Sequence, residues 1–270
     1  MVIRQTISAR RVRTLQIASV LTLLVGYTYL SWRQHQINPM DTTIPTWSQM
    51  WDGVLKTLAV NGSDHTRWLI ADAMASGERL FLGLALGLAG AFTIGVAMGC
   101  LQSVGAFFEP LLALAASVPP TGMLAVMFVI FGFGLNMYVA MITFGVLPTL
   151  AQAIYLGTKD VQDEEIWKAY TLGASHMEVV WHVVVRRIAP KILDVICLQI
   201  GPAVVYLIAA EVICADIGFG YRIRLQAKLT HMDIAYPYLA IASGLTYLTR
   251  FTITKVREWQ FPWFDQRGVS

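Results

Sequence analysis

The chain has 270 residues, of which 56% are hydrophobic and 14% are charged, and its mean hydropathy is +0.57. A soluble domain carries about a quarter charged residues, so this composition argues against a soluble protein and for one that lies in a bilayer. The formal net charge of +3 is too small to indicate nucleic acid as a partner, and it fits a modest excess of cytoplasmic Lys and Arg.

Six apolar stretches are long enough to span a membrane, which takes roughly 20 residues for about 30 Å of hydrocarbon. They cover residues 15–32, 79–101, 107–130, 136–157, 192–213 and 235–254. The first follows an arginine-rich segment, and no small-residue cleavage site comes after it. We therefore interpret it as a retained transmembrane anchor, with a cleaved signal peptide as the alternative.

A polar segment separates the first span from the other five. It carries Trp47, Trp51, Val54 and Leu55 at the spacing of one helix face. This stripe predicts an amphipathic helix, which either lies at the membrane surface or packs against the bundle.

Six spans place both termini on one side of the membrane, and the Lys and Arg counts decide which side. One side collects the cations at the N-terminus, at residues 159–191 and at the C-terminus, whereas the cations of the other side are accompanied by Asp and Glu at residues 41–78, 216 and 233. We therefore predict that both termini are cytoplasmic and that the loop between the fourth and fifth spans is cytoplasmic too.

Small residues and prolines interrupt the apolar runs. The second span has five glycines, with two pairs four residues apart: Gly83, Gly87, Gly90, Gly95 and Gly99. This spacing predicts close helix packing in lipid. Four prolines are expected to interrupt other spans: Pro119, Pro120, Pro148 and Pro202. Broken helices are common in transporters, although packing kinks alone would explain the prolines.

The stretch EEIWKAYTLGAS at residues 164–175 begins a folded loop between the fourth and fifth spans. Asp163 is expected to cap a first short helix, with Glu164 and Glu165 in the first turn, where the helix dipole favours negative charge. Gly173 suits a bend with positive φ at the end of this helix.

Ser175 and Glu178 form the S-x-x-E pattern of a capping box, which predicts a second short helix that ends at a Pro190 break. The two helices make an elbow with apolar residues that the spans need not cover. Such a surface on a folded loop indicates a site for a partner protein. A helix that rests on the membrane interface is the alternative.

Ionisable residues in the spans are candidates for function. Glu211, in the outer half of the fifth span, is the main candidate for a gate, and an ion pair with Arg222 or Arg224 is the alternative. Arg79 begins the second span beside Glu78, where it either pairs or snorkels, or attracts an anionic solute at the external mouth.

Met127 and Phe131 are apolar candidates for the lining of a translocation pathway, with ordinary packing as the alternative. The histidines are scattered without ligand spacing, so the sequence predicts no metal site. It also predicts no catalytic residue and no cofactor bound by this chain.

The run WKAYTLGASHMEVVWHVVVRRIAPKIL resembles the EAA loop of binding-protein-dependent ABC importer permeases. Trp167, Lys168 and Ala169 occupy the E-A-A positions, so Trp and Lys replace the usual Glu and Ala. Gly173 matches the glycine, and Arg186 stands where a proline is frequent. The resemblance implies that the ATPase-coupling loop consists of Trp167, Lys168, Ala169, Gly173, Ala174, Ser175, Met177 and Val180.

The resemblance extends over residues 76–270 and is closest to the nitrate/sulfonate/taurine-type permeases. The segment AAEVICADIGFGYRI is similar to the A-E-x-x-x-x-x-x-G-L-G-Y segment of that group, with Phe219 in place of Leu. The implied fold is an all-α membrane protein of about six transmembrane helices, the type I ABC importer permease fold. Its expected parts are residues 1–75 with the first span and the amphipathic segment, a permease core at 76–256 with the coupling loop at 160–190, and a cytoplasmic tail at 257–270.

In that family the elbow docks on a separate ATPase. The chain has no G-x-x-x-x-G-K-[ST] phosphate loop, so ATP and Mg would be used by a partner. The resemblance implies a dimer of ABC ATPase subunits, a second permease copy in a homodimer, a periplasmic or lipid-anchored solute-binding protein and membrane lipid, in the bacterial inner membrane.

We therefore expect a non-catalytic permease subunit for a small polar or anionic solute, such as nitrate, a sulfonate or taurine. A stand-alone secondary transporter is the main alternative, and a membrane-embedded enzyme or an assembly factor are others. More spans or an inverted repeat would favour the secondary transporter. Clustered His residues or carboxylates would favour the membrane-embedded enzyme.

Overall fold

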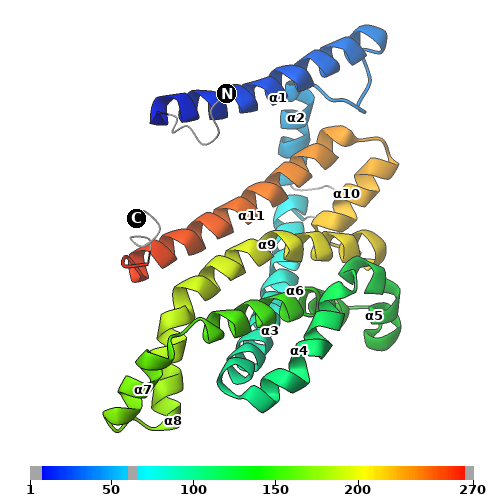
Figure 1. Cartoon of the computed structure of the whole chain (residues 1–270). Coiled ribbons are helices and arrows are strands. Elements are labelled where there is room, and N and C mark those ends of the chain that lie inside the picture. The colour runs from blue at the N-terminus through cyan, green and yellow to red at the C-terminus, as the bar shows by residue number, and fades with distance from the viewer. Residues whose placement is uncertain (1–7, 60–65, 265–270) are drawn as a thin grey trace.

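The computed structural model describes residues 8–59 and 66–264, and nearly all of them are helical (Figure 1). The helices are α1 (Ala9–Ile37), α2 (Trp47–Leu58), α3 (Trp68–Cys100), α4 (Gln102–Ser117), η1 (Pro120–Met123), α5 (Leu124–Phe131), α6 (Leu135–Lys159), α7 (Asp163–Thr171), α8 (His176–Glu178), η2 (Val179–Val185), α9 (Arg186–Cys214), α10 (Phe219–Lys228) and α11 (Met232–Gln260). The all-α membrane architecture expected from the sequence is confirmed.

Among the described residues, four helices are long and apolar enough to cross a membrane: Arg10–Ile37, Trp68–Cys100, Leu135–Lys159 and His176–Cys214. A fifth crossing forms if α4 and the η1–α5 pair are one span, bent by 84°. Helix α11 occupies the sixth expected span. Its 29 residues are about 44 Å long, but interleaved Tyr, Thr and Ser keep it less apolar than the other four.

The prolines act in two different ways. Pro119 and Pro120 divide the expected third span, because α4 ends at Ser117 and the bend follows at once. Pro148 lies inside α6 and Pro202 lies inside α9, and both helices continue through them. The expected interruptions at these two prolines are therefore wrong, and a helix packed in a bundle tolerates an interior proline in this way.

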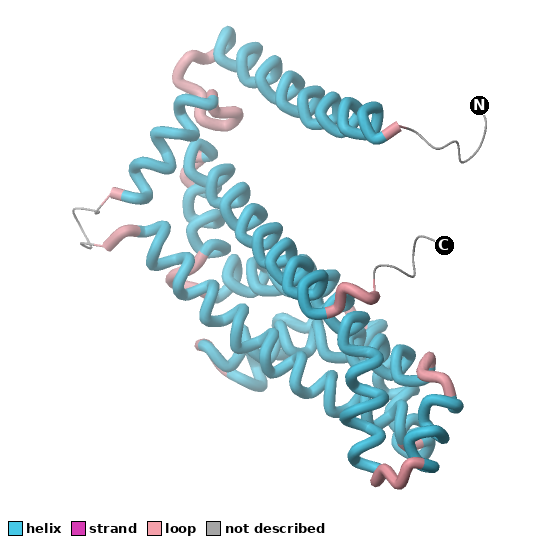
Figure 2. The backbone as a smooth tube through the Cα atoms, turned by 90° about the vertical axis from the view of Figure 1, so that its left-hand side faces the viewer, coloured by secondary structure: helices cyan, strands magenta, loops and turns pink. Residues whose placement is uncertain are grey.

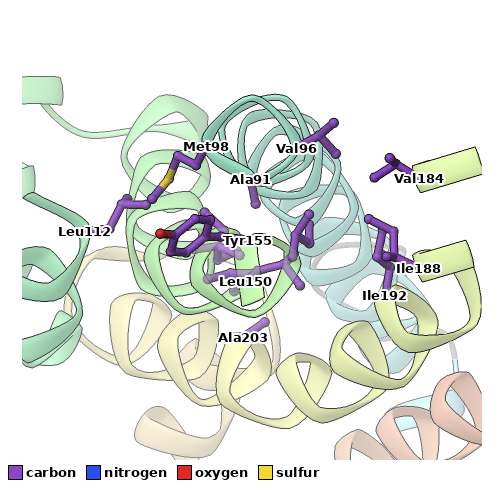
Figure 3. Close-up of a cluster of buried hydrophobic side chains, with 14 of the residues drawn as sticks. Ala91, Val96, Met98, Leu112, Leu150, Tyr155, Val184, Ile188, Ile192 and Ala203 are labelled. Atoms are coloured by element: carbon purple, nitrogen blue, oxygen red, sulfur yellow. The ribbon is translucent and has the colours of Figure 1, made fainter. Parts of the chain in front are cut away.

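The core forms where α3 meets α6. A Cβ atom added to Gly83 would lie 2.6 Å from Ile142 Cβ, and one added to Gly95 would lie 2.7 Å from the Ala151 carbonyl oxygen. The close packing predicted from the glycine repeat is therefore confirmed. Figure 3 shows this core between α3, α6 and the first turns of α9, where Ile188 contributes to it.

The apolar stripe of α2 does not pack against the bundle. Trp51 and Leu55 are 64% and 49% exposed, while Gly53 and Thr57 on the other face are buried. Gly53 lies against the backbone of Asp233 in α11. Of the two expected arrangements, helix α2 therefore packs against the bundle, through the face of Gly53 and Thr57, while Trp51 and Leu55 face outward.

Helix α1 stands away from the bundle along most of its length and is joined to it near α2 (Figures 1 and 2). In the most apolar 18-residue stretch of this helix, only 6% of the residues are buried. The Tyr27 hydroxyl donates to the Pro45 carbonyl oxygen at 2.7 Å, and the Trp47 indole donates to the Thr28 hydroxyl at 3.0 Å. These contacts fix one end of α1 and leave its faces available to lipid or protein.

Candidate functional site

The first arm of the elbow is α7. Asp163, Glu164 and Glu165 all lie in its first turn, where their charges face the positive end of the helix dipole. The helix begins one residue earlier than expected, because Gln162 and not Asp163 is the N-cap, and no side chain caps it. The start of this helix is therefore stabilised by the charges of its first turn and not by a capping side chain.

The bend after α7 is a Schellman turn. Gly173 has φ +87°, its N–H donates to the Tyr170 carbonyl oxygen at 2.9 Å, and the Ala174 N–H donates to the Ala169 carbonyl oxygen at 3.1 Å. This pair of hydrogen bonds needs a residue in the left-handed region, which glycine enters without strain. The predicted bend at Gly173 is confirmed.

The second arm begins with the predicted capping box. The Glu178 N–H donates to the Ser175 hydroxyl, and the Glu178 carboxylate accepts from the Ser175 N–H at 2.8 Å. The helix does not end at Pro190, however. It runs without a break from His176 to Cys214 and passes through the π-helical segment η2. The elbow therefore continues directly into a membrane span, because packing of Val184, Ile188 and Ile192 in the core keeps the helix continuous through Pro190.

The two arms are braced against each other. The Tyr170 hydroxyl lies 2.8 Å from His176 Nδ1, and the rings of these residues are in edge contact with centroids 5.3 Å apart. The Glu165 carboxylate lies 3.6 Å from the Arg187 guanidinium at the start of α9. Each contact joins an α7 residue to the second arm, so the angle between the arms is held from both sides.

The elbow is also joined to the bundle. Val179 and Val184 are buried, and Ile166 packs against the main core. The Trp181 ring lies 6.0 Å from the Phe92 ring of α3. A force on the elbow would therefore reach both α3 and α9 through packed side chains.

The outer face of the elbow is apolar and uncovered. Trp167 is 66% exposed, Met177 is 70% exposed and Leu172 is 89% exposed. We call these three residues the docking face. Of the predicted coupling residues, Lys168, Gly173 and Ser175 are also exposed, whereas Ala169, Ala174 and Val180 turn partly inward.

Leu172 was missed by the sequence-based reasoning. It occupies the C-cap position of α7, where the chain leaves the helix and the side chain no longer follows the inward face. An apolar residue directly before the left-handed glycine was the signal that could have found it.

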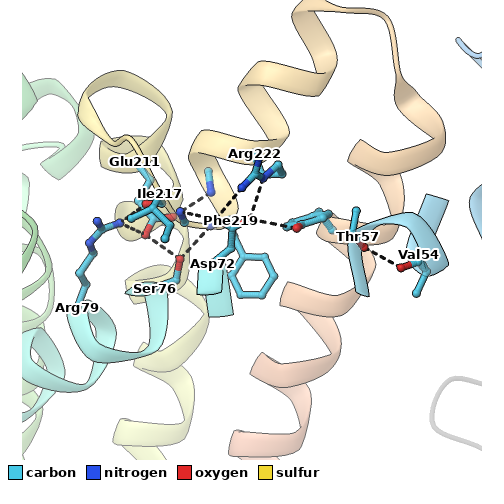
Figure 4. Close-up of polar contacts among 12 residues, drawn as sticks. Val54, Thr57, Asp72, Ser76, Arg79, Glu211, Ile217, Phe219 and Arg222 are labelled. Carbon is cyan, nitrogen blue, oxygen red and sulfur yellow. Dashed lines mark hydrogen bonds and ion pairs between the residues drawn. The ribbon is translucent and has the colours of Figure 1, made fainter. Parts of the chain in front are cut away.

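Figure 4 shows a second group of residues, at the end of the bundle opposite the elbow. Arg79 Nη1 lies 2.7 Å from Glu211 Oε1, and Glu211 is fully buried. The same oxygen accepts from the Ser76 hydroxyl at 2.7 Å, and Oε2 accepts from the Gly220 N–H at 2.9 Å. The guanidinium also donates to the Ile217 carbonyl oxygen at 2.7 Å.

A second carboxylate completes this group. Buried Asp72 accepts from Arg222 Nε at 2.9 Å, from the Tyr238 hydroxyl at 3.0 Å and from the Gly218 N–H at 2.9 Å. The expected pairing of Glu211 with Arg222 or Arg224 is therefore wrong. Arg224 donates instead to backbone carbonyl oxygens at the end of α9.

We call Asp72, Ser76, Arg79, Glu211 and Arg222 the polar cluster. It joins α3 to the turn between α9 and α10, where Gly218 has φ +129° and a Cβ would lie 2.5 Å from Glu211 Oε1. Each carboxylate has a guanidinium partner and further donors, so its charge is compensated inside the protein. Asp72 and Ser76 were missed, although with Arg79 they follow the i, i+4, i+7 spacing of one helix face.

Met127 and Phe131 lie apart from the polar cluster. Both line an open apolar hollow of about 610 Å³ between α3, α4, α5 and α6, together with Asn136, Thr143 and Phe144. Met127 is buried and Phe131 is 46% exposed. The four residues expected to share a pathway thus fall into two groups, and Arg79 and Glu211 do not line this hollow.

The structure is thus a helical membrane bundle with a bent span and a folded elbow between two spans, and broken spans of this kind are common in transporters. Residues 87–257 match the family described as "binding-protein-dependent transport system inner membrane component". The chain therefore belongs to this family and is a permease subunit of an ABC importer, a transport subunit and not an enzyme. A stand-alone secondary transporter is not supported.

Known relatives agree with this assignment. The taurine transport system permease protein TauC of Escherichia coli is 26% identical over 254 residues, which cover 94% of this chain and 90% of TauC. A probable ABC transporter permease protein of Brucella melitensis is 30% identical over 173 residues, which cover 64% of this chain and 68% of that protein.

Solved structures share the fold. An inward-facing structure of the MetNI methionine ABC transporter superposes with a TM-score of 0.59 at 16% identity, covering 73% of this chain and 98% of the other. An amino acid ABC transporter superposes with a TM-score of 0.52 at 15% identity, covering 78% of this chain and 92% of the other. The type I importer fold is therefore confirmed.

Proposed function

We propose that this chain forms the membrane pathway for a small polar or anionic solute and that the elbow couples the pathway to a separate ATPase. The observation that carries the proposal is the docking face, Trp167, Leu172 and Met177, exposed on an elbow that is otherwise braced. Large apolar side chains on a rigid support are typical centres of protein interfaces.

ATP and Mg are used in this proposal by the partner, which acts as a dimer of ABC ATPase subunits. A rigid elbow is needed for such coupling, because a flexible loop would absorb the movement of the ATPase. The continuous helix from His176 to Cys214 supports this transmission, since its first turn belongs to the elbow and its remainder to a span. The elbow end of the bundle would then face the cytoplasm of the bacterium, with both termini on that side.

A second copy of the chain would complete the pathway. Met127 and Phe131 border a hollow that is open on one side, as half of a pathway between two copies would be. Arg79 and Glu211 are assigned a different task. Because their charged atoms are occupied by each other and by the α9–α10 turn, they would hold the outer end of the pathway in shape.

The solute class rests on the similarity to TauC over 94% of this chain. Taurine is a small sulfonate, and we propose a solute of that kind, delivered by a periplasmic or lipid-anchored solute-binding protein. The hollow is lined largely by apolar side chains and carries no charged residue, so it offers an anion no strong binding site, and the anion would have to keep its water as it passes.

The test is reconstitution of the chain with the ATPase and the solute-binding protein encoded nearest to it. We expect a stable complex, ATP hydrolysis that the loaded binding protein stimulates, and uptake of labelled taurine that other small sulfonates compete with. Uptake of a different solute would overturn the solute class alone. Failure to form a complex with any ABC ATPase would overturn the coupling role.

A further inference from the structure

A groove between α9 and α11 carries an arginine at one end. The groove has a volume of about 360 Å³, and its walls include Gly201 and Val205 of α9 and Leu239, Tyr247 and Arg250 of α11. Val205 is 59% exposed and Tyr247 is 72% exposed, so the groove is open to whatever surrounds the bundle. Helices α9 and α11 lie side by side along it (Figure 1).

Arg250 lies at membrane depth and not beyond the end of the span. The Cys197 thiol, in the second turn of the expected span at 192–213, contacts the Arg250 carbonyl oxygen. One to two turns further toward the elbow, Arg257 pairs with Asp194. Arg250 therefore lies within the expected sixth span at 235–254, near its elbow-side end.

No carboxylate within residues 8–59 and 66–264 forms an ion pair with Arg250, and its side chain is exposed. A cation at this depth is costly without a counter-charge. The other cations on this part of α11 have partners in the chain, since Lys255 pairs with Glu258 and Arg257 with Asp194. The described residues therefore supply no counter-charge to Arg250, and an anion bound in the groove would supply one.

We propose that this groove binds an anionic phospholipid, with the phosphate on Arg250 and an acyl chain along the groove. The groove runs from Arg250 to Leu239, eleven residues or about 16 Å of helix. This length matches one leaflet, which is about half of the 30 Å hydrocarbon core. Its charged end is the end nearer the membrane surface, as the phosphate of a lipid in the elbow-side leaflet requires.

A second copy of the chain is the other conceivable occupant, through its uncovered α1. The sequence of α1, ARRVRTLQIASVLTLLVGYTYLSWRQHQI, contains four Arg and no Asp or Glu. It would bring more positive charge to Arg250 and no counter-charge. Charge complementarity therefore favours the lipid. This proposal needs only that α9 and α11 cross a bilayer, and it is independent of the transported solute and of the ATPase.

The test is retention of lipid by the purified full chain, measured by native mass spectrometry with phosphatidylglycerol and phosphatidylcholine of the same acyl chains. The wild-type chain is expected to retain phosphatidylglycerol preferentially. Arg250→Gln should weaken this retention about fivefold, the effect of one cation near a membrane surface. Arg250→Lys keeps the charge and should keep the preference. Lys255→Gln is the matched control, because it removes a cation from the same helix outside the groove.

Gly201→Leu tests the groove separately from the charge. A Cβ at Gly201 meets no atom within 4 Å, so a side chain there fills the groove without disturbing the fold. We expect this variant to retain neither lipid tightly. The proposal is overturned if Arg250→Gln keeps the full preference, if Lys255→Gln loses as much, or if inorganic phosphate displaces the lipid. A crosslink between Ser243→Cys and α1 of another copy would also overturn it.

Discussion

The Arg79 guanidinium and the Glu211 carboxylate lie 2.7 Å apart in the interior, although 132 positions separate the two residues. The pair joins α3 to α9, and the hydrogen bond from Arg79 to the Ile217 carbonyl oxygen extends it to the turn before α10. Arg79 also lies 4.3 Å from the centre of the Tyr138 ring in α6. Arg79 thus links three helices and a turn, and these contacts give it a structural role.

Glu211→Gln should destabilise the protein, because it leaves the Arg79 charge buried without its counter-charge. Removal of one partner from a buried ion pair costs about 3–5 kcal/mol. We expect a lower midpoint of thermal unfolding and reduced assembly with the ATPase.

The double variant Arg79→Met, Glu211→Met serves as the control for a purely structural pair, since apolar side chains of similar volume often replace an ion pair without loss. Recovery of both stability and uptake would assign the pair to structure alone. Recovery of stability without uptake would instead assign it a part in gating, contrary to our interpretation.

Gly173→Val should uncouple ATP hydrolysis from uptake. Valine strains a position with φ +87° by roughly 1–3 kcal/mol, and the strain would be relieved by a change in the angle between the elbow arms. Gly173→Asn is the control, because asparagine tolerates the left-handed region. The measurement is uptake per ATP hydrolysed. Normal uptake by an assembled Gly173→Val complex would contradict the prediction.

Trp167→Ala should weaken binding of the ATPase by about 2 kcal/mol, or roughly 30-fold in the dissociation constant. The indole is 66% exposed on the docking face, and a large aromatic side chain at the centre of an interface carries much of its energy. Trp259→Ala is the matched control, since Trp259 is 81% exposed at the end of α11, outside the docking face. Titration of detergent-solubilised permease with the ATPase measures the effect, and equal losses for both variants would refute it.

Phe131→Ala should relax the size limit of the pathway, because it removes a half-exposed ring from the wall of the hollow. We expect uptake of a larger sulfonate to rise relative to taurine, with ATPase binding unchanged. Phe133→Ala is the control, as Phe133 lies two positions away, is 75% exposed and does not line the hollow. An unchanged uptake ratio would remove Phe131 from the pathway.

The elbow could be predicted in detail because its structure is local. The bend at Gly173 and the capping box of Ser175 with Glu178 depend on residues within six positions of each other. The error at Pro190 arose because proline disfavours a helix locally, whereas packing against the bundle keeps this one continuous. The exposed Leu172 was missed because it lies outside the periodic pattern of either arm.

The polar cluster could be predicted only in part. Burial of Glu211 and its need for a cation follow from its place in an apolar run. The sequence distance to Arg222 and Arg224 is short, and this made them the expected partners. The actual partner comes from α3, and Arg222 is taken by Asp72. Helix packing, which brings α3 against the end of α9, decides between chemically equivalent arginines.

The sequence by itself determined what short-range physics controls: a membrane protein from its apolar runs, close packing of one helix from its glycines, and a capped elbow from its turn residues. The tertiary structure decided which distant residues meet. Arg79 pairs with Glu211, Trp51 of α2 faces outward, and Met127 borders a hollow that Glu211 does not line. The reason is that hydrogen bonds within a turn depend on neighbouring residues alone, whereas a buried ion pair depends on how whole helices pack.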